Sequence, residues 1–308
     1  MIKKYIFPLG MTTFIVCFPA TAQNWQSINN EVTFNTSLGW LGGESKEYVY
    51  DEGHKASQLD WKIKNAAIIK GDISWTPVSY ITLNARGWTT LASGSGEMED
   101  YDWQDESQSH WTDKSTHPDT PLNYANEFDI NIKGWIFNQP NYRFGGVVGY
   151  QQTRYSWTSY GGTYNYDNGT DKGEFPRGET GIGYQQKFSA PYMGVAGMYR
   201  YQDVEFNALF KFSPWVEAKD NDEHYLRDTT FRSNTKNSRY YFASVDAGYY
   251  VTPNVKVFTE LSWAKYEKEK GSMEVINYRT GERDYYGSNT SGIENESYMI
   301  TAGIQYRF

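Results

Sequence analysis

Apolar and polar residues alternate with a period of two along most of the chain. Residues 127–136 are typical: Phe128, Ile130, Ile132 and Ile136 alternate with Glu127, Asp129, Asn131 and Lys133. Residues 298–308 alternate in the same way up to the final Phe308. Because successive side chains of a strand point to opposite faces, the pattern predicts β-strands with one apolar and one polar face.

Residues 59–75 predict a longer strand of the same kind. On one face we place the apolar residues Leu59, Trp61, Ile63, Ala67, Ile69, Ile73 and Trp75. The other face then carries lysines and aspartates, with Ala66 and Ile68 as apolar exceptions. Similar strands are expected to start near Val78, Tyr142, Val204, Tyr241 and Val255.

The length of the alternation favours a membrane barrel over a soluble sandwich. Sandwich strands usually have about five or six residues, whereas here the alternation continues over about ten or more. After the first 22 residues, the sequence has no apolar run long enough for a transmembrane helix. We therefore predict an all-β fold: a closed transmembrane antiparallel β-barrel with lipid outside and a polar lumen.

Turn signals predict the topology of this barrel. Short signals occur at residues 76–79, 138–141, 201–204 and 252–254. The intervals between them exceed the roughly 20 residues of two membrane strands, so each also holds a long loop. We expect those loops near residues 43–56, 93–122, 158–174, 220–235 and 272–293. Short periplasmic turns and long extracellular loops predict about ten strands with both termini in the periplasm.

The first 22 residues predict a secretory signal. Lys3 and Lys4 precede an apolar run, and small residues surround a cleavage point after Ala22. A membrane anchor would need a longer run. Residues 23–308 then form a single barrel domain without cysteine, because Cys17 lies in the signal, which excludes disulfides and thiolate metal sites.

Composition narrows the range of partners. Aromatic residues make up 18% of the chain, with 27 Tyr and 11 Trp. Such rings suit a membrane interface, where one end is apolar and the other is wet. The net charge of −8 argues against nucleic acid as a partner.

Two pairs of residues in the expected extracellular loops could activate water. Asp100 and Asp102 are two positions apart in an extended segment, so both face one way and could share a proton while holding a water. Asp222 and His224 have the same spacing, and the carboxylate could orient His224 as a general base. Without further information, a solvated acidic loop is the simpler interpretation of each pair.

Other chemistries have weaker support in the sequence. The four histidines lack the spacing of zinc ligands, so we predict no metal site and no metal cofactor. A serine triad is possible on paper, because Ser107, Ser109 and Ser115 lie near His110 and His117. No nucleophile elbow surrounds these serines, and loop serines usually only form turns.

Several motifs together resemble those of the omptins, the outer-membrane endopeptidases of enteric bacteria. They are "SQLDWKIKNAAIIKGDISW", "RGWTTLASGSG", "WTDKSTHPDT", "NYANEFDINIKGW", "DNDEHY" and "AGYYVTPN". They occur in order across essentially all of residues 23–308, and they are specific. "LNARGWTTLASGSG" and "NALFKFS" are most similar to the plasminogen-activator branch of that family.

The resemblance implies a ten-stranded barrel that extends beyond the membrane, with an active groove at its outer mouth. It implies that a water is activated between Asp222–His224 and Asp100–Asp102, with His224 as the general base. All four positions carry the residue type that the family requires. The implied enzyme is an aspartic-type endopeptidase of the bacterial outer membrane, active on the extracellular side.

The resemblance also implies what the enzyme binds. Glu47 and Asp220 match an acidic pocket for Arg or Lys of a polypeptide substrate, and Asp113 matches the acid beyond the scissile bond. Without the resemblance, an ion pair of Glu47 with its neighbour Lys46 would be preferred. Cationic antimicrobial peptides and plasminogen are the expected substrates.

A lipopolysaccharide site is implied on the outer wall, and activity is expected to require this lipid. The matching residues are Tyr150, Arg154, Lys187 and Lys236. The sequence departs from the family pattern at Gln152, where an acid is common, and at Lys187, where Arg is common. Lys binds phosphate as a point charge, without the two-pronged contact of Arg.

Two alternatives to a protease remain. A non-enzymatic adhesin could use the long aromatic loops. A pore is disfavoured, because about ten strands leave a narrow lumen that the inward Lys, Arg, Asp and Glu would fill.

Overall fold

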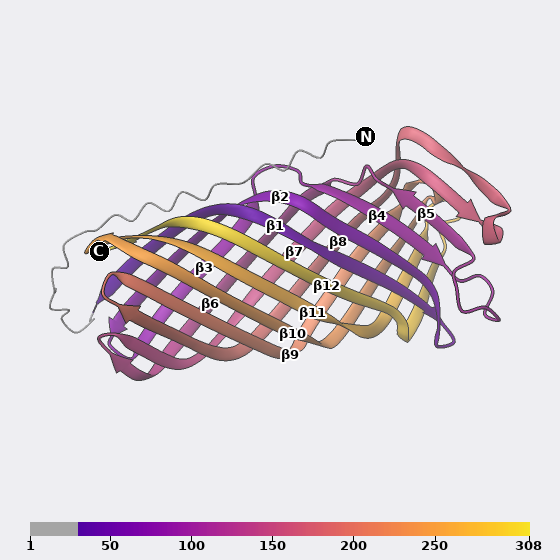
Figure 1. Ribbon diagram of the computed structural model, residues 1–308. Coiled ribbons are helices and arrows are strands. Elements are labelled where there is room, and N and C mark those ends of the chain that lie inside the picture. Colours follow the sequence, from indigo (N-terminus) through magenta and orange to yellow (C-terminus); the bar gives the residue numbers. More distant parts are fainter. Residues whose placement is uncertain (1–29) are drawn as a thin grey trace, which may run out of the picture.

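The computed structural model describes residues 30–308 as one closed antiparallel sheet (Figure 1). The predicted signal segment, with Cys17, lies outside the described residues. Among residues 30–308, no helix is long and apolar enough to span a membrane. The elements are β1 (Glu31–Asp51), β2 (His54–Val78), β3 (Ile81–Thr90), β4 (Ser95–Asp102), β5 (Asp113–His117), β6 (Leu122–Gln139), β7 (Tyr142–Tyr166), η1 (Asp167–Gly169), β8 (Asp171–Tyr201), β9 (Val204–His224), η2 (Tyr225–Arg227), β10 (Thr229–Thr252), β11 (Val255–Asn277) and β12 (Arg283–Arg307).

The twelve strands occupy ten positions around a ring. β1 pairs with both β2 and β12, which closes the sheet. β3 and β4 share one side of β2, and β5 and β6 share one side of β7, so the ring has two positions fewer than twelve. This arrangement confirms the predicted barrel of about ten strands.

The chain leaves the strand pattern between β3 and β4 and between β5 and β6, at the same level of the ring. The link from β5 to β6 contains Pro118 and Pro121, which have no backbone N–H to donate to a ladder. Beside this link, the first residues of β4 lie very close to the neighbouring backbone. A Cβ on Gly96 would lie 2.4 Å from the Thr120 carbonyl oxygen, so only glycine fits there.

Strand hairpins replace most of the long loops that the sequence predicts. β1 and β2 are joined by a turn at Glu52 and Gly53, and β7 and β8 stay paired up to Tyr166 and Asp171. The predicted loops were therefore wrong in extent, because strand pairing continues beyond the membrane band. The strand expected near Val78 starts three residues later, at Ile81. The predicted start near Tyr241 was wrong, because Tyr241 lies inside β10, which begins at Thr229. The short turns at the other end are confirmed.

The two faces of β2 exchange roles part of the way along the strand. Leu59, Trp61 and Ile63 point inward, but farther along the chain Ala66 and Ile68 are the buried residues and Ile69 is exposed. β2 has one residue more than both β1 and β4 between Ile63 and Ala66, as the register shifts on both sides show. The predicted single apolar face was wrong, because this bulge shifts the alternation by one.

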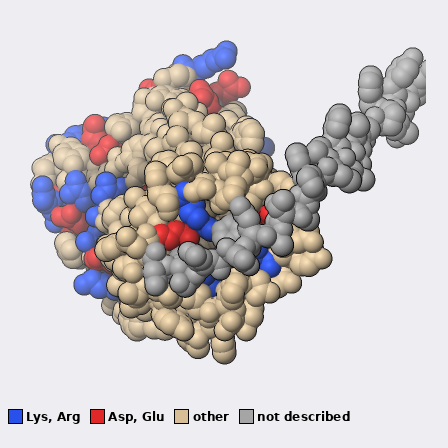
Figure 2. Space-filling model, turned by 90° about the vertical axis from the view of Figure 1, so that its left-hand side faces the viewer, with Lys and Arg blue, Asp and Glu red and all other residues tan. Residues whose placement is uncertain are grey.

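The part of the barrel nearer the short turns has an apolar exterior and a polar interior. On β6, Phe128, Ile130 and Ile132 are exposed, whereas Asp129 and Asn131 between them are buried. Figure 2 views the end with the short turns, where charged side chains are visible in a hollow inside a rim of uncharged residues. This distribution suits a lipid-exposed wall around a polar lumen.

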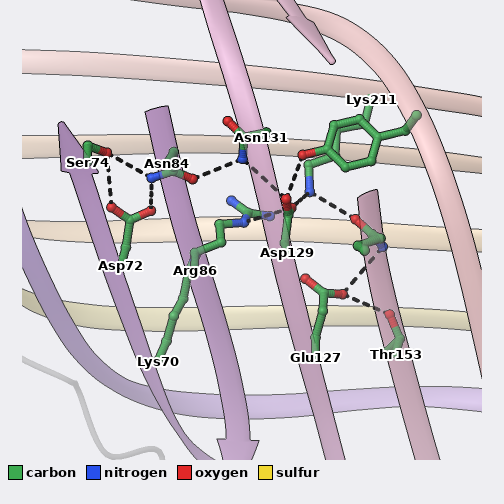
Figure 3. A network of polar contacts seen from close by, with 12 residues as sticks. Lys70, Asp72, Ser74, Asn84, Arg86, Glu127, Asp129, Asn131, Thr153 and Lys211 are labelled. Atoms are coloured by element: carbon green, nitrogen blue, oxygen red, sulfur yellow. Dashed lines mark hydrogen bonds and ion pairs between the residues drawn. The ribbon is translucent and has the colours of Figure 1, made fainter. Parts of the chain in front are cut away.

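A network of buried charges fills the middle of the lumen (Figure 3). Lys211 is fully buried and forms an ion pair with Asp129, and Arg86 Nε lies 3.3 Å from the same carboxylate. The Tyr192 hydroxyl also donates to Asp129 (2.7 Å), and Lys211 donates to Gln151 (2.9 Å). A lumen filled in this way leaves no open pore at this level.

A layer of stacked aromatic rings lies between this network and the outer mouth. Tyr266 stacks on Phe188, with ring centroids 4.0 Å apart, and Trp61 stacks on Tyr184 at 4.9 Å. Trp157 packs beside both Trp61 and Tyr184. These buried rings form a rigid floor beneath the inward residues of the mouth.

We predict that the two partners of the central ion pair contribute unequally to stability. Asp129→Ala leaves Lys211 and Arg86 buried without their carboxylate, and should cost about 3–5 kcal/mol. Lys211→Met should cost much less, because Asp129 keeps Arg86 and Tyr192. Urea unfolding of the barrel in lipid vesicles measures both, and equal losses would contradict this account of the network.

Candidate active site

Asp222 and His224 lie at the end of β9 and point into the mouth of the barrel. The Asp222 Oδ2 atom is 2.7 Å from Nε2 of His224. Burial alone would lower the pKa of His224, but the charge and hydrogen bond of Asp222, together with Asp100, raise it above its usual value. The imidazole is thus held in one orientation, with Nδ1 as the nitrogen that can exchange a proton with a substrate or water.

Asp100 and Asp102 end β4 on the facing side of the mouth. Burial and the nearby charge of Asp102 raise the pKa of Asp100 to about 8. Burial also raises the pKa of Asp102, although a hydrogen bond with Ser57 and the charge of Arg227 oppose this rise. The pair can therefore hold a proton near neutral pH, as predicted for two adjacent carboxyl groups.

Glu47 and Asp220 are buried acidic residues beside these pairs, and we call the position that they share the acidic pocket. Glu47 on β1 is 1% exposed, and burial followed by the charges of Asp222, Asp220 and Asp100 raises its pKa well above the usual value. Burial raises the pKa of Asp220 to about 7, although its Oδ1 accepts a hydrogen bond from the Ser233 backbone N–H (2.7 Å). Glu47 makes no ion pair with Lys46, which instead contacts Glu44 at 2.9 Å.

Three oxygen atoms of this cluster have no hydrogen-bond partner among the described residues. They are Glu47 Oε2, Asp100 Oδ1 and Asp222 Oδ1, and all three are buried. Buried carboxylate oxygens are costly to leave unpaired. A cationic ligand that entered the cluster would relieve this cost.

Asp113 lies on β5, directly opposite Asp102 in the register of β4 and β5. Its Oδ2 accepts a hydrogen bond from the Thr112 hydroxyl (2.6 Å), and its Oδ1 accepts one from the Asp167 backbone N–H (2.9 Å). Asp113 is thus anchored to η1, on the far side of Asp102 from Glu47. The predicted residues of the site are all brought to one end of the barrel.

Strand pairing stops at two places around the outer rim, and we call these places seams. β1 and β12 are paired only as far as Val49 and Ser291, and β8 and β9 only as far as Ile182 and His224. The seams divide the rim into one half formed by β1–β8 and another formed by β9–β12. Glu47, Asp100 and Asp102 belong to the first half, and Asp220, Asp222 and His224 to the second.

Several residues of this site were not predicted from the sequence. Arg227 on η2 is exposed, and its charge acts on Asp100, Asp102 and His224. The Tyr184 hydroxyl lies 3.4 Å from Asp220 Oδ2. Arg227 follows His224 closely and could have been noticed, but nothing in the sequence places Tyr184 opposite Asp222.

One serine and one histidine of the possible triad do contact each other, but a substrate could not reach them. Ser115 Oγ lies 2.9 Å from Nε2 of His117, and Nδ1 of His117 contacts the carbonyl oxygen of Gly161. Both Ser115 and His117 are buried, and the second partner of the imidazole is a backbone carbonyl rather than a carboxylate. The pair therefore links β5 to β7 and does not form a triad.

The predicted lipid-binding residues lie on the outer wall. Arg154 and Lys187 are register partners on β7 and β8, and Lys187 is paired in turn with Lys219 on β9. Lys219 was missed by the sequence analysis. Lys236 is paired with Glu217, two residues from Lys219. Gln152, the position where an acid was expected, accepts a hydrogen bond from Arg154 (2.6 Å).

Comparisons with known proteins agree with this geometry. The sequence model of the Omptin family matches residues 28–308. The chain is 58% identical over 278 residues to the plasminogen activator of Yersinia pestis, covering 90% of this chain and 89% of that protein. It is 47% identical over 311 residues to protease 7 of Escherichia coli strain K12, covering 98% and 96%. Among solved structures, it resembles the outer membrane protease OmpT of Escherichia coli, with a TM-score of 0.88, 48% identity, and 93% and 99% of the two chains covered.

The raised pKa values predict that the unliganded protein loses stability as the pH rises. Unfolded carboxyl groups lose their proton near pH 4, whereas folded Asp220 and Asp100 keep theirs up to about 7 and 8. Between these limits the folded state binds more protons than the unfolded state. Each such proton lowers the unfolding free energy by about 1.4 kcal/mol per pH unit as the pH rises.

Urea unfolding between pH 4 and pH 9 measures this dependence. Asp100→Asn should flatten the decline, because the amide has no proton to lose. Asp51→Asn, at an exposed carboxyl group on the β1–β2 turn, is the matched control and should leave the decline unchanged. A wild-type stability that rises from pH 5 to pH 8 would refute the assignment.

Proposed function

The chain belongs to the omptin family of outer-membrane proteases, and on this basis we propose that it is an endopeptidase that cleaves exposed polypeptides beside Arg or Lys. His224, oriented by Asp222, takes a proton from a water molecule that attacks the scissile carbonyl. When the tetrahedral intermediate breaks its C–N bond, His224 gives this proton to the leaving amine. Asp100 and Asp102 hold this water from the other half of the rim and share a proton with the tetrahedral intermediate. The mechanism is thus of the aspartic type, assisted by histidine.

The observation that carries this proposal is the placement of the two pairs on opposite halves of the rim. Charge interactions couple Asp100 to both His224 and Asp222, so the two pairs act on each other across the mouth. The seams leave the mouth open on two sides of the cluster. A polypeptide could therefore extend past the site in both directions, as cleavage within a chain requires.

The acidic pocket supports a preference for basic residues. An Arg side chain between Glu47 and Asp220 would pair with both carboxylates, and a neutral side chain would leave them buried without a partner. Asp113 would face a second basic residue beyond the scissile bond. The relative from Yersinia pestis is named a plasminogen activator, so we include plasminogen among the proposed substrates, together with cationic antimicrobial peptides.

We also propose that lipopolysaccharide binds the outer wall and supports activity. Arg154, Lys187 and Lys219 form a row of cations across three strands, where lipid phosphates would bind. Tyr150 lies below them and lines an apolar hollow with Ile130, Val148, Met193 and Trp215, which suits an acyl chain. Lys236 would add a fourth cation near the row.

The decisive experiment on the mechanism measures cleavage of a quenched Arg-Arg peptide by the refolded barrel with lipopolysaccharide. His224→Ala and Asp222→Asn should each lower kcat by at least about 100-fold, the contribution expected of a positioned general base. A peptide with Ala in place of Arg tests the pocket and should be cleaved poorly. If folded wild-type protein does not cleave the Arg-Arg peptide, the adhesin alternative is favoured.

The lipid proposal predicts that protein without lipopolysaccharide gains activity when the lipid is added. Arg154→Ala or Lys187→Ala should raise the lipid concentration needed for half-maximal activity roughly fivefold, as about 1 kcal/mol per cation implies. Lys265→Ala is the control, because Lys265 lies on another part of the wall and pairs with Glu296 at 3.1 Å. Full activity without lipid would count against the proposal.

A further inference from the structure

Above the seam between β1 and β12, one strand of the sheet has a free edge. Residues 283–286 of β12 pair with β11 on one side, and residues 287–290 form an irregular segment without register partners on β11 before pairing resumes. Among the described residues, no strand pairs with the other side of residues 283–290. We call this segment the rim edge.

The rim edge differs from the other free edge, which lies at the second seam. Residues 171–181 of β8 also lack a neighbour on one side, but they contain Pro176, three acidic residues and two basic residues. Proline and charge are the usual means by which an edge strand is protected from pairing. The rim edge contains no proline and only two charged residues, Arg283 and Asp284, and it carries Tyr285 and Tyr286, of which Tyr285 is 79% exposed. It is therefore open to an additional strand.

The rim edge leads directly to the acidic pocket. Ile293, three residues beyond the rim edge, is the register partner of Glu47. The base of the seam is held by two lysines of β11, because Lys268 lies over the ring of Tyr48 at 4.5 Å and Lys270 over the ring of Tyr50 at 4.2 Å. A chain that leaves the Glu47 pocket through this seam must pass the unpaired backbone groups of β12.

We propose that the rim edge binds the main chain of the substrate, as an added β-strand, on the N-terminal side of the scissile bond. This inference rests on the proposed function, in which Glu47 and Asp220 hold the basic residue before that bond and Asp113 lies beyond it. The ligand is an extended polypeptide recognised through its backbone amides. Backbone recognition places little demand on side chains, so on the N-terminal side of the scissile bond sequence preference comes from the acidic pocket alone.

The test uses wild-type enzyme with lipopolysaccharide and Arg-Arg peptides that carry at least five residues before the first Arg. Each amide before that Arg is replaced in turn by its N-methyl form, which removes a donor without changing the side chain. Because alternate residues of a strand face the same neighbour, every second replacement should lower kcat/KM by about 3- to 10-fold, the factor for one hydrogen bond. Replacements two or more residues beyond the scissile bond should have little effect.

A uniform response to all replacements, or a larger one beyond the scissile bond, would overturn the proposal. A peptide that begins at the first Arg is the control for the proposed function. If this short peptide is cleaved but the longer one gains nothing over it, the rim edge is not a binding site and the protease assignment stands. If wild-type enzyme cleaves neither, the proposed function itself fails.

A protein variant provides an independent check. Tyr285→Pro and Asp284→Pro remove adjacent backbone donors, of which one faces the open side of the rim edge and the other faces β11. One of the two should lower kcat/KM for the long peptide about 3- to 10-fold and leave the short peptide unaffected. Glu174→Pro places the same change on the protected edge of β8 and should affect neither peptide. The N-methyl series keeps the test valid if a variant fails to fold.

Discussion

Below the seams, every strand is paired on both sides, and this closure holds the catalytic residues in place. A closed ring satisfies its own backbone groups, which a lipid environment demands. Within it, the charge of Lys211 is neutralised by Asp129 across the lumen, and aromatic rings fill the space above. The carboxylates at the mouth therefore lie on a rigid floor. This floor and the closed ring keep them close together, although the electrostatic repulsion among them favours their separation.

That repulsion is the basis of the site's chemistry. Four acidic side chains, Glu47, Asp100, Asp220 and Asp222, act on one another's charge in a space where burial raises several of their pKa values. The unliganded site is therefore partly protonated near neutral pH, and three of its buried carboxyl oxygens lack a hydrogen-bond partner among the described residues. A guanidinium group entering this space would replace protons by a fixed positive charge. Recognition of a basic residue and preparation of the catalytic carboxylates are thus two results of the same electrostatic arrangement.

The strand period and the short turns were sufficient to predict the barrel and its approximate strand number. The residue spacing suggested the two candidate pairs, and the resemblance to the omptins indicated the other acidic residues at the mouth. The extent of the hairpins could not be predicted, because glycine-rich segments such as residues 158–174 have weak strand preference of their own and form strands here by pairing with a neighbour. The shift of the alternation in β2 was not predicted, because Ala66 and Ile68 could be taken as apolar exceptions on a polar face as well as signs of a bulge. Lys219 was missed for a related reason: only the register of β8 and β9 shows that it joins Arg154 and Lys187.

The extra residue in β2 has a consequence for how such a protein can change during evolution. It lies between the part of the wall that must match the thickness of the bilayer and the part that carries the catalytic cluster. Deleting it would turn Leu59, Trp61 and Ile63 outward and bring Asp60 and Lys62 into the aromatic floor. Insertions and deletions are therefore tolerated at the hairpin tips but not at this position. A designer who moved this mouth onto another barrel would have to carry the bulge with it.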